Sequence, residues 1–327
     1  MKKTKILVVG ASGQIGTDLT TALAAEFGPD QVLASDIHES PRDPALKHYI
    51  SLDVLNEAEL ERVVTENGIT QIYLLAAMLS VNAERNPDLA WKLNVQSLLS
   101  VLHIAKEHQL DKVFWPSSIA VFGATSPRFR CPQHTRIEPD TIYGISKRTG
   151  EYWCNYYFEK YGVDVRSLRY PGLISHSAPP GGGTTDYAVD IFHQALEKGA
   201  YTCYLSPDNS LPMMYMADAV RAALELMRAP RANIRTRTAY NIAGLSFAPS
   251  ELVTAIRRYL PDFQMSYSPD FRDAIARSWP ASIRDDEARK DWGWQPAYPL
   301  ARLTETMLRQ LSSKKNISLL VDDCLEG

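Results

Sequence analysis

The stretch that decides the fold is Lys5-Ile6-Leu7-Val8-Val9-Gly10-Ala11-Ser12-Gly13-Gln14-Ile15-Gly16. Its apolar run before the first glycine is typical of a strand buried on both faces of a parallel sheet. Glycines follow at three-residue intervals, and apolar residues at 19, 23 and 27 then mark the buried stripe of a helix. Any tight strand-to-helix turn favours glycine, but in this unit we expect Gly10 to make the turn, Gly13 to admit a pyrophosphate and Gly16 to allow helix–strand contact. The stretch therefore predicts a dinucleotide-binding α/β fold, with Gln14 and Ile15 also at the cofactor.

Acidic residues near the ends of the next two predicted strands indicate which dinucleotide binds. The strand at 31–35 leads to Asp36, twenty residues after Gly16. A carboxylate there can accept hydrogen bonds from the adenosine ribose hydroxyls and repel a 2′-phosphate, which favours NAD over NADP. A cap or loop position is the alternative for Asp36, and Arg42 nearby works against this preference. Asp53, in the predicted strand 49–54, could reach the adenine or cap the following helix, and Val54 is expected beside it at the cofactor.

The fourth predicted strand, 72–77, ends in Ala76 and Ala77, whose small side chains would let the cofactor lie against the backbone. Ser80 follows and should face the same crevice. Asn94 is the polar exception on a long apolar helical pattern from 86 to 109, so it is either satisfied locally or holds the backbone beneath the cofactor. Tyr170 completes the expected cofactor contacts.

Tyr143 and Lys147 are four residues apart at the start of a predicted helix, which places both side chains on one face. An unperturbed phenol titrates near ~10, and a nearby positive charge lowers that pKa, so the tyrosine could act as a base. Taken alone, these two residues could simply be an exposed pair, four residues apart, on the surface of the helix. Ser118 follows the predicted strand 112–115, and the carboxyl end of a parallel strand is where ligands bind in open α/β sheets.

Composition excludes several other classes of function. A net charge of −3 and scattered basic residues give no reason to expect nucleic acid. Four cysteines lie far apart and the seven histidines form no ligand-like spacing, so we predict neither a metal site nor disulfides. No apolar run approaches the roughly 20 residues of a membrane span, and a strand begins within about five residues of the N-terminus. These features predict a cytoplasmic protein without a membrane partner.

Together these residues resemble the extended short-chain dehydrogenase/reductase superfamily, of the nucleotide-sugar epimerase type. Longer segments resemble its short-chain-type L-threonine 3-dehydrogenases: RYPGLIS at 169–175, PPGGGTTDYA at 179–188, LPMMY at 211–215, WPASI at 279–283 and DWGW at 291–294. The match runs from about residue 5 to about residue 310, loosely over 124–136. It implies an NAD-dependent enzyme that oxidises the β-hydroxyl of L-threonine to 2-amino-3-oxobutanoate. Tyr143 would be the base, Ser118 would orient the hydroxyl, and Lys147 would assist Tyr143 and hold the nicotinamide ribose.

The substrate region is suited to a small molecule with one negative charge. Three glycines at 181–183 lead into a helix predicted from 184 to 199, so bare N–H groups and a helix N-terminus converge there. A nucleotide-sugar enzyme must neutralise a diphosphate, yet residues 173–194 contain no lysine or arginine. The alternative is a glycine hinge followed by a capped helix whose dipole Asp186 complements. Expected substrate contacts are Ser80, Ser118, Tyr143, Gly181, Gly182, Thr184, Thr185 and Trp279, although Trp279 could equally be a structural core residue.

The expected architecture is α/β: a doubly wound parallel-sheet Rossmann domain at 1–172, to which segments from about 210–245 return, and a smaller C-terminal α/β substrate lobe at 173–312, followed by a tail at 313–327. Apolar helices at 86–109 and 143–160 have more than one apolar side, which together with the resemblance predicts a homodimer. Two other functions remain open: a nucleotide-sugar epimerase or dehydratase on the same scaffold, and a non-catalytic NAD-binding sensor.

Overall fold

Seven parallel strands form the centre of the molecule in the computed structural model, which describes residues 4–42, 46–177 and 183–315. The strands lie in the order β10 (Tyr240–Asn241), β6 (Val165–Tyr170), β5 (Lys112–Ser118), β4 (Gln71–Leu74), β1 (Ile6–Val9), β2 (Val32–Asp36) and β3 (Tyr49–Ser51). Because β1 lies between β4 and β2, the order of the strands reverses beside it, and ligands bind at such a switch point. The predicted doubly wound α/β class is confirmed.

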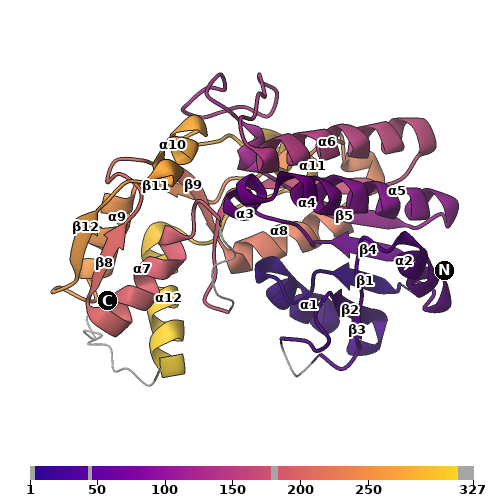
Figure 1. Ribbon diagram of the computed structural model, residues 1–327, viewed down its shortest axis with the longest axis horizontal. Coiled ribbons are helices and arrows are strands. Elements are labelled where there is room, and N and C mark those ends of the chain that lie inside the picture. Colours follow the sequence, from indigo (N-terminus) through magenta and orange to yellow (C-terminus); the bar gives the residue numbers. More distant parts are fainter. Residues whose placement is uncertain (1–3, 43–45, 178–182, 316–327) are drawn as a thin grey trace.

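Helices cover both faces of this sheet, which explains the continuous apolar run in β1. Ile6 and Val8 pack on the face covered by two helices, α1 (Gln14–Phe27) and α8 (Met216–Arg228). Leu7 and Val9 pack on the opposite face, under α2 (Glu57–Glu66), α5 (Ser97–Glu107) and α6 (Ile142–Tyr161). Figure 1 shows α5 and α6 on one side of the sheet and α1 on the other. Each fully buried aliphatic side chain contributes about 1.5–3 kcal/mol.

A smaller lobe lies beside the sheet and has its own apolar core. Figure 1 places β8, β12, α7 and α9 at the end of the molecule far from β1. The lobe contains a three-stranded sheet of β11 (Leu245–Phe247), β9 (Leu211–Tyr215) and β7 (Gly172–Ile174), and a pair, β12 (Gln264–Tyr267) and β8 (Ala200–Cys203). Its helices are α7 (Tyr187–Lys198), α9 (Pro249–Arg257), α10 (Phe271–Ser278) and α12 (Leu300–Lys315). Another helix, α11 (Asp286–Trp292), contacts β10 through the hydrogen bond from Tyr240 to Asp291. The domain boundary near residue 172 stays a prediction, although β10 does pair with β6 in the main sheet.

The predicted single helix at 86–109 is instead three consecutive pieces. The segment begins with α4 (Pro87–Trp91), continues as a π-helical turn, η2 (Lys92–Gln96), and ends as α5. A short helix, α3 (Ser80–Arg85), precedes it. The π turn contains Asn94, whose side chain bonds to the backbone of Met78. A π turn widens the helix locally and is frequent at functional sites. The apolar pattern of the sequence does not reveal such a turn.

Shorter elements complete the chain. Three 3₁₀ turns are η1 (Pro29–Gln31), η3 (Ile119–Val121) and η4 (Arg231–Asn233). The helix α2 is capped by Asn56, whose side chain accepts a hydrogen bond from the Glu59 backbone N–H at 3.2 Å. Within the ranges that the structure describes, none of the helices has both the length and the apolar composition needed to cross a bilayer.

Candidate active site

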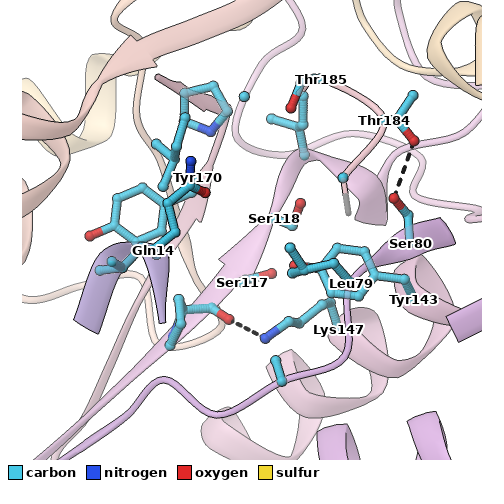
Figure 2. A pocket seen from close by; sticks show the side chains of 18 of the residues that line it. Gln14, Leu79, Ser80, Ser117, Ser118, Tyr143, Lys147, Tyr170, Thr184 and Thr185 are labelled. Carbon is cyan, nitrogen blue, oxygen red and sulfur yellow. Dashed lines mark hydrogen bonds between the residues drawn. The ribbon is translucent and has the colours of Figure 1, made fainter. Parts of the chain in front are cut away.

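A cavity of about 270 Å³ opens where β1, β4, β5 and β6 end. It brings together most of the residues expected from the sequence. Those that line it are Gly10, Gly13, Gln14, Ile15, Gly16, Ala77, Ser80, Ser118, Tyr143, Lys147, Tyr170, Thr184, Thr185 and Trp279. Figure 2 shows Ser118 in the middle of this group, Gln14 and Tyr170 on one side, and Ser80 and Thr184 on the other. The cavity therefore has a wall from the glycine turn and a wall from the lobe.

The glycine turn is held by two close contacts. Gly10 has φ of +91°, and a Cβ there would lie 2.6 Å from the backbone nitrogen of Ala76. A Cβ on Gly16 would collide with the carbonyl oxygen of Gly10. At Gly13 an added Cβ would come 3.2 Å from that same oxygen, a far looser contact. All three glycines line the cavity, and the first and third are also needed for close packing of the turn.

A dinucleotide fits this wall. Gly13 and Gln14 line the cavity at the start of α1, where backbone N–H groups and the helix dipole favour a pyrophosphate. The Gln14 Nε2 atom is buried and has no hydrogen-bond partner among the described residues. A buried donor without a partner costs about 1–3 kcal/mol, so a polar ligand group there would relieve that cost.

Asp36 lies beside the turn rather than in the cavity lining. One of its carboxylate oxygens accepts the Ser12 backbone N–H at 3.0 Å, and the other lies 2.6 Å from His38 Nδ1. The carboxylate therefore fixes the glycine turn at the end of β2, where a ribose would approach. This position suits the predicted role of Asp36 in selecting NAD over NADP, and that role of the residue stays a prediction.

Four other expected cofactor residues also lie outside the cavity lining. Asp53 is exposed and accepts the Leu55 backbone N–H at 3.0 Å in the turn before α2, and the N-cap of that helix is Asn56 rather than Asp53. Val54 is buried in the core under α2. Ala76 packs against that core and approaches Gly10.

The fourth of them, Asn94, acts as a clamp behind the cavity. Its Oδ1 accepts the Met78 N–H at 2.8 Å, and its Nδ2 donates to the Met78 carbonyl at 3.0 Å and to Ser146 Oγ at 3.1 Å. The side chain therefore ties the segment after β4 to α6. This geometry agrees with the expectation that Asn94 holds backbone beneath the cofactor.

Tyr143 and Lys147 lie on the cavity side of α6, as their spacing predicts. Thr141 caps the helix by accepting the Gly144 N–H at 3.1 Å, which fixes the first turn. Lys147 is 2% exposed, and its Nζ donates to the Pro116 carbonyl at 2.7 Å and lies 4.5 Å from the Trp115 ring centroid. The same Nζ is 5.7 Å from the centroid of the Tyr143 ring.

Burial determines the pKa values of both side chains. It raises the pKa of Tyr143 to about 12, and the hydrogen bond with Ser118 lowers it only in part. Burial also lowers the pKa of Lys147 to about 7. The sequence predicts that Lys147 lowers the pKa of Tyr143, but in this structure the opposing group is Ser118. The reason is that burial without a carboxylate partner disfavours the charged form of the lysine and lowers its own pKa.

A buried carboxylate behind the cavity was missed by the sequence analysis. Glu151 is fully buried and accepts a hydrogen bond from Ser117 Oγ at 2.7 Å. Arg169 binds both of its oxygens, at 2.7 and 2.8 Å, and Arg148 adds a contact at 2.9 Å. The signal was present, because Glu151 follows Lys147 by four residues and so extends the same helical face.

The wall opposite the glycine turn is polar and is formed by Ser80 of α3 and by Thr184, Thr185 and Asp186 from the lobe. Ser80 Oγ and Thr184 Oγ1 are both buried and lie 3.1 Å apart (Figure 2). Asp186 is the N-cap residue of α7, but its carboxylate accepts the Gly183 N–H at 2.7 Å and makes no capping hydrogen bond to the helix. Among the described residues of the lining, Lys147 is the only basic one. Gly181 and Gly182 lie outside the described residues, and α7 begins at residue 187 rather than at 184.

Trp279 completes the lobe side of the cavity. Its side chain is 4% exposed, and its Nε1 atom is buried without a partner in the described part of the chain. Arg128 Nη1 donates to the Trp279 carbonyl at 2.6 Å, so the loop before α6 holds this residue in place. Trp279 also packs in the core of the lobe, and both expectations for it therefore agree with its position.

Among the residues that the structure describes, no group of three or more His, Cys, Asp or Glu side chains could hold a metal ion.

Comparison with known proteins places this geometry in a family. The model of the NAD dependent epimerase/dehydratase family matches residues 6–243. The bovine protein named L-threonine 3-dehydrogenase, mitochondrial, is 44% identical over 96% of this chain and 84% of its own length. A solved GalE-like L-threonine dehydrogenase from Cupriavidus necator, in its holo form, is 53% identical with a TM-score of 0.92, covering 94% of this chain and 99% of that one.

A further solved structure bears on assembly. It is described as a monomeric L-threonine 3-dehydrogenase from a metagenome, and it is 45% identical with a TM-score of 0.91, covering 94% of this chain and 99% of that one. The resemblance stated from the sequence motifs is confirmed by these matches.

Proposed function

Since the chain belongs to the NAD dependent epimerase/dehydratase family, we propose that it is an NAD-dependent enzyme that oxidises the β-hydroxyl of L-threonine to 2-amino-3-oxobutanoate. One observation carries the choice of substrate. The cavity presents Ser118 and Tyr143 opposite a wall whose hydroxyls come from Ser80 and Thr184, and Lys147 is the only basic residue among its described lining. A small zwitterion can bind such a wall, whereas a nucleotide-sugar diphosphate needs positive partners.

The chain's own residues perform the proton transfer in this proposal. Tyr143 removes the hydroxyl proton, and Ser118 hydrogen-bonds the same oxygen and orients it. NAD, when bound, supplies the hydride acceptor for C3. Because burial raises the pKa of Tyr143 to about 12, its phenolate must be stabilised by positive charge. Lys147 is the cation nearest to hand, with Nζ 5.7 Å from the Tyr143 ring centroid.

The proposal extends to the residues that bind the rest of the substrate. We propose that Ser80, Thr184 and Thr185 bind the carboxylate and ammonium groups, together with the N–H groups of Gly181 and Gly182. Trp279 would cover the methyl end and exclude water. Its buried position at the lobe side of the cavity supports this role.

One assay tests the function and separates it from its alternatives. NADH absorbance is followed with L-threonine and NAD in the wild-type protein, in Tyr143→Phe and in Tyr161→Phe. Tyr161 is 45% exposed at the end of the same helix and serves as the matched control. We expect NADH from the wild type and the control, and a loss of about 100-fold or more in Tyr143→Phe.

Three outcomes contradict the proposal. Absence of NADH with L-threonine refutes the reaction, and full activity in Tyr143→Phe refutes the role of that tyrosine. Conversion of a nucleotide sugar with no net NADH would instead favour the epimerase alternative, and tight NAD binding without any turnover would favour a sensor.

We propose further that the protein is a homodimer through α4 and α6. Large apolar or aromatic side chains are exposed on these two helices: Leu89, Trp91, Ile145, Tyr152 and Tyr156. Clustered exposed apolar residues mark interfaces more often than bare surface. Sedimentation equilibrium tests this, and a monomer at working concentration, as described for the metagenome enzyme, would refute it. The cytoplasmic location also stays a proposal, tested by fractionation, since the bovine relative is named mitochondrial.

A further inference from the structure

A second cavity, of about 500 Å³, lies on the other side of Glu151 from the active site. Its walls come from the loop before α6, from α6, from β6, from the segment before β10 and from α11. The charged residues that line it are five bases and two acids: Arg148, Arg169, Arg235, Arg237, Lys290, Glu287 and Asp291. Such an excess of positive charge on the walls of a concave site favours an anion.

The five bases are not equally neutralised within the protein. Arg169 is paired with Glu151, and Arg237 Nη1 lies 2.6 Å from Asp164. Arg235 approaches Asp291 only at 3.8 Å, and its side chain is 67% exposed.

Lys290 is neutralised even less than Arg235. It is exposed in the last turn of α11 and has no ion pair among the residues that the structure describes. Asp291 already accepts a hydrogen bond from Tyr240 at 2.7 Å. The positive charge of Arg235 and Lys290 therefore remains available at the cavity.

Two further donors of this lining are buried and unused. The Nε atoms of Arg148 and Arg237 have no hydrogen-bond partner in the described chain. The Arg237 side chain is 4% exposed, so water does not readily replace a partner there. Each unmade buried bond costs about 1–3 kcal/mol, and more for a charged group. An anion with several oxygens could accept from these donors.

From these observations we propose that this cavity is a second ligand site, which binds a small phosphate-bearing anion. Guanidinium groups match phosphate oxygens with paired N–H donors, and lysine adds a compact charge. The volume leaves room for more than a bare phosphate. Arg235 and Lys290 attract the anion, and Arg148 and Arg237 supply the buried donors.

The site is separate from the cofactor site but adjoins the active site. Arg148 and Arg169 both bind Glu151, and Glu151 accepts the hydrogen bond of Ser117 on the wall of the first cavity. One carboxylate therefore connects the two cavities.

Calorimetric titration with pyrophosphate tests the proposal. The protein is first saturated with NADH, which fills the glycine turn and prevents phosphate from binding there. Titrations at low salt compare the wild type with the double variant Arg235→Ala/Lys290→Ala. The control is Lys198→Ala/Arg258→Ala, which removes the same two charges at exposed positions, Lys198 being in the last turn of α7 as Lys290 is in α11.

We expect pyrophosphate to bind the wild type and the control alike, and the affinity of Arg235→Ala/Lys290→Ala to fall at least tenfold. Since the exposed side chains are removed, thermal melting should be the same for all three proteins. The proposal is overturned by absence of binding up to about 10 mM pyrophosphate, a concentration that detects even a very weak site. It is overturned equally by unchanged affinity in Arg235→Ala/Lys290→Ala, or by an equal loss in the control, which would indicate diffuse attraction to net charge.

Discussion

Replacing Ser118 with alanine should move the pH dependence of the reaction as well as slow it. The hydrogen bond with Ser118 is what lowers the pKa of Tyr143 against the effect of burial, which raises it to about 12. A hydrogen bond to a charged group is worth about 1.5–3 kcal/mol, and one pKa unit corresponds to about 1.4 kcal/mol. In Ser118→Ala the pKa of Tyr143 should therefore rise by about one to two units.

The assay is the pH profile of kcat/KM for L-threonine at saturating NAD. The base is active as the phenolate, so activity rises with pH until Tyr143 is deprotonated, and a higher pKa moves this rising limb to higher pH. At a fixed pH on that limb, a shift of one to two units predicts a loss of about 10-fold to 100-fold. Titration of the substrate's ammonium is common to all variants and cancels in the comparison.

Ser117→Ala is the matched control, because the neighbouring serine donates to Glu151 instead of bonding to Tyr143. We expect this variant to keep the rising limb of the wild type, whatever its effect on the rate. Two results refute the reasoning: a Ser118→Ala enzyme that is slower but has an unmoved limb, or a Ser117→Ala enzyme whose limb moves equally far.

Three further predictions concern buried charge and the choice of dinucleotide. Glu151→Gln leaves the Arg169 guanidinium without its carboxylate, and should cost about 3–5 kcal/mol in urea denaturation at pH 7, whereas Arg148→Met, which removes a partly exposed partner, should cost about 1 kcal/mol or less. Lys147→Met should be more stable than the wild type, most clearly at and below pH 7. The pKa of Lys147 falls to about 7 on folding, so between pH 7 and the ordinary pKa of lysine the unfolded chain binds more protons than the folded one. In that pH range the stability of the wild type rises with pH, by at most about 1.4 kcal/mol per pH unit. The stability advantage of Lys147→Met should therefore shrink as the pH rises above 7. Asp36→Asn keeps an acceptor for the glycine turn but removes the charge, so it should narrow the ratio of kcat/KM for NAD over NADP, and an unchanged ratio would show that Asp36 is not the selector.

Much of the main domain could be predicted because its elements are built from local signals. The apolar run before Gly10 reports burial on both faces, and the Asn56 cap is fixed by residues three positions apart. The long apolar pattern at 86–109 did not predict the π turn, because such a turn keeps the apolar composition while it changes the direction of the side chains. The π turn contains Asn94, which bonds to Met78 sixteen residues away, and no local pattern records that contact.

The site divides in the same way. Tyr143 and Lys147 were found because their relation is a helical spacing, and Ser118 because it ends a strand. The role of Asp53 at the cofactor stays a prediction, because the 3.0 Å contact of its carboxylate with the Leu55 N–H is local and does not distinguish a turn acid from a ligand-binding acid. The pKa of Tyr143 could not be predicted from its neighbour either, because burial, a property of the whole fold, outweighs the spacing.

Burial also predicts that the tyrosine and the lysine act as a pair. Each prefers its neutral form in this environment, with pKa values near 12 for Tyr143 and near 7 for Lys147. A phenolate beside an ammonium satisfies both, because each charge provides the partner that the other lacks. The two groups should therefore titrate together, with apparent pKa values that belong to the pair. Lys147→Met should then depress activity across the whole pH range, and an undisturbed rising limb in that variant would mean that Tyr143 titrates independently of Lys147.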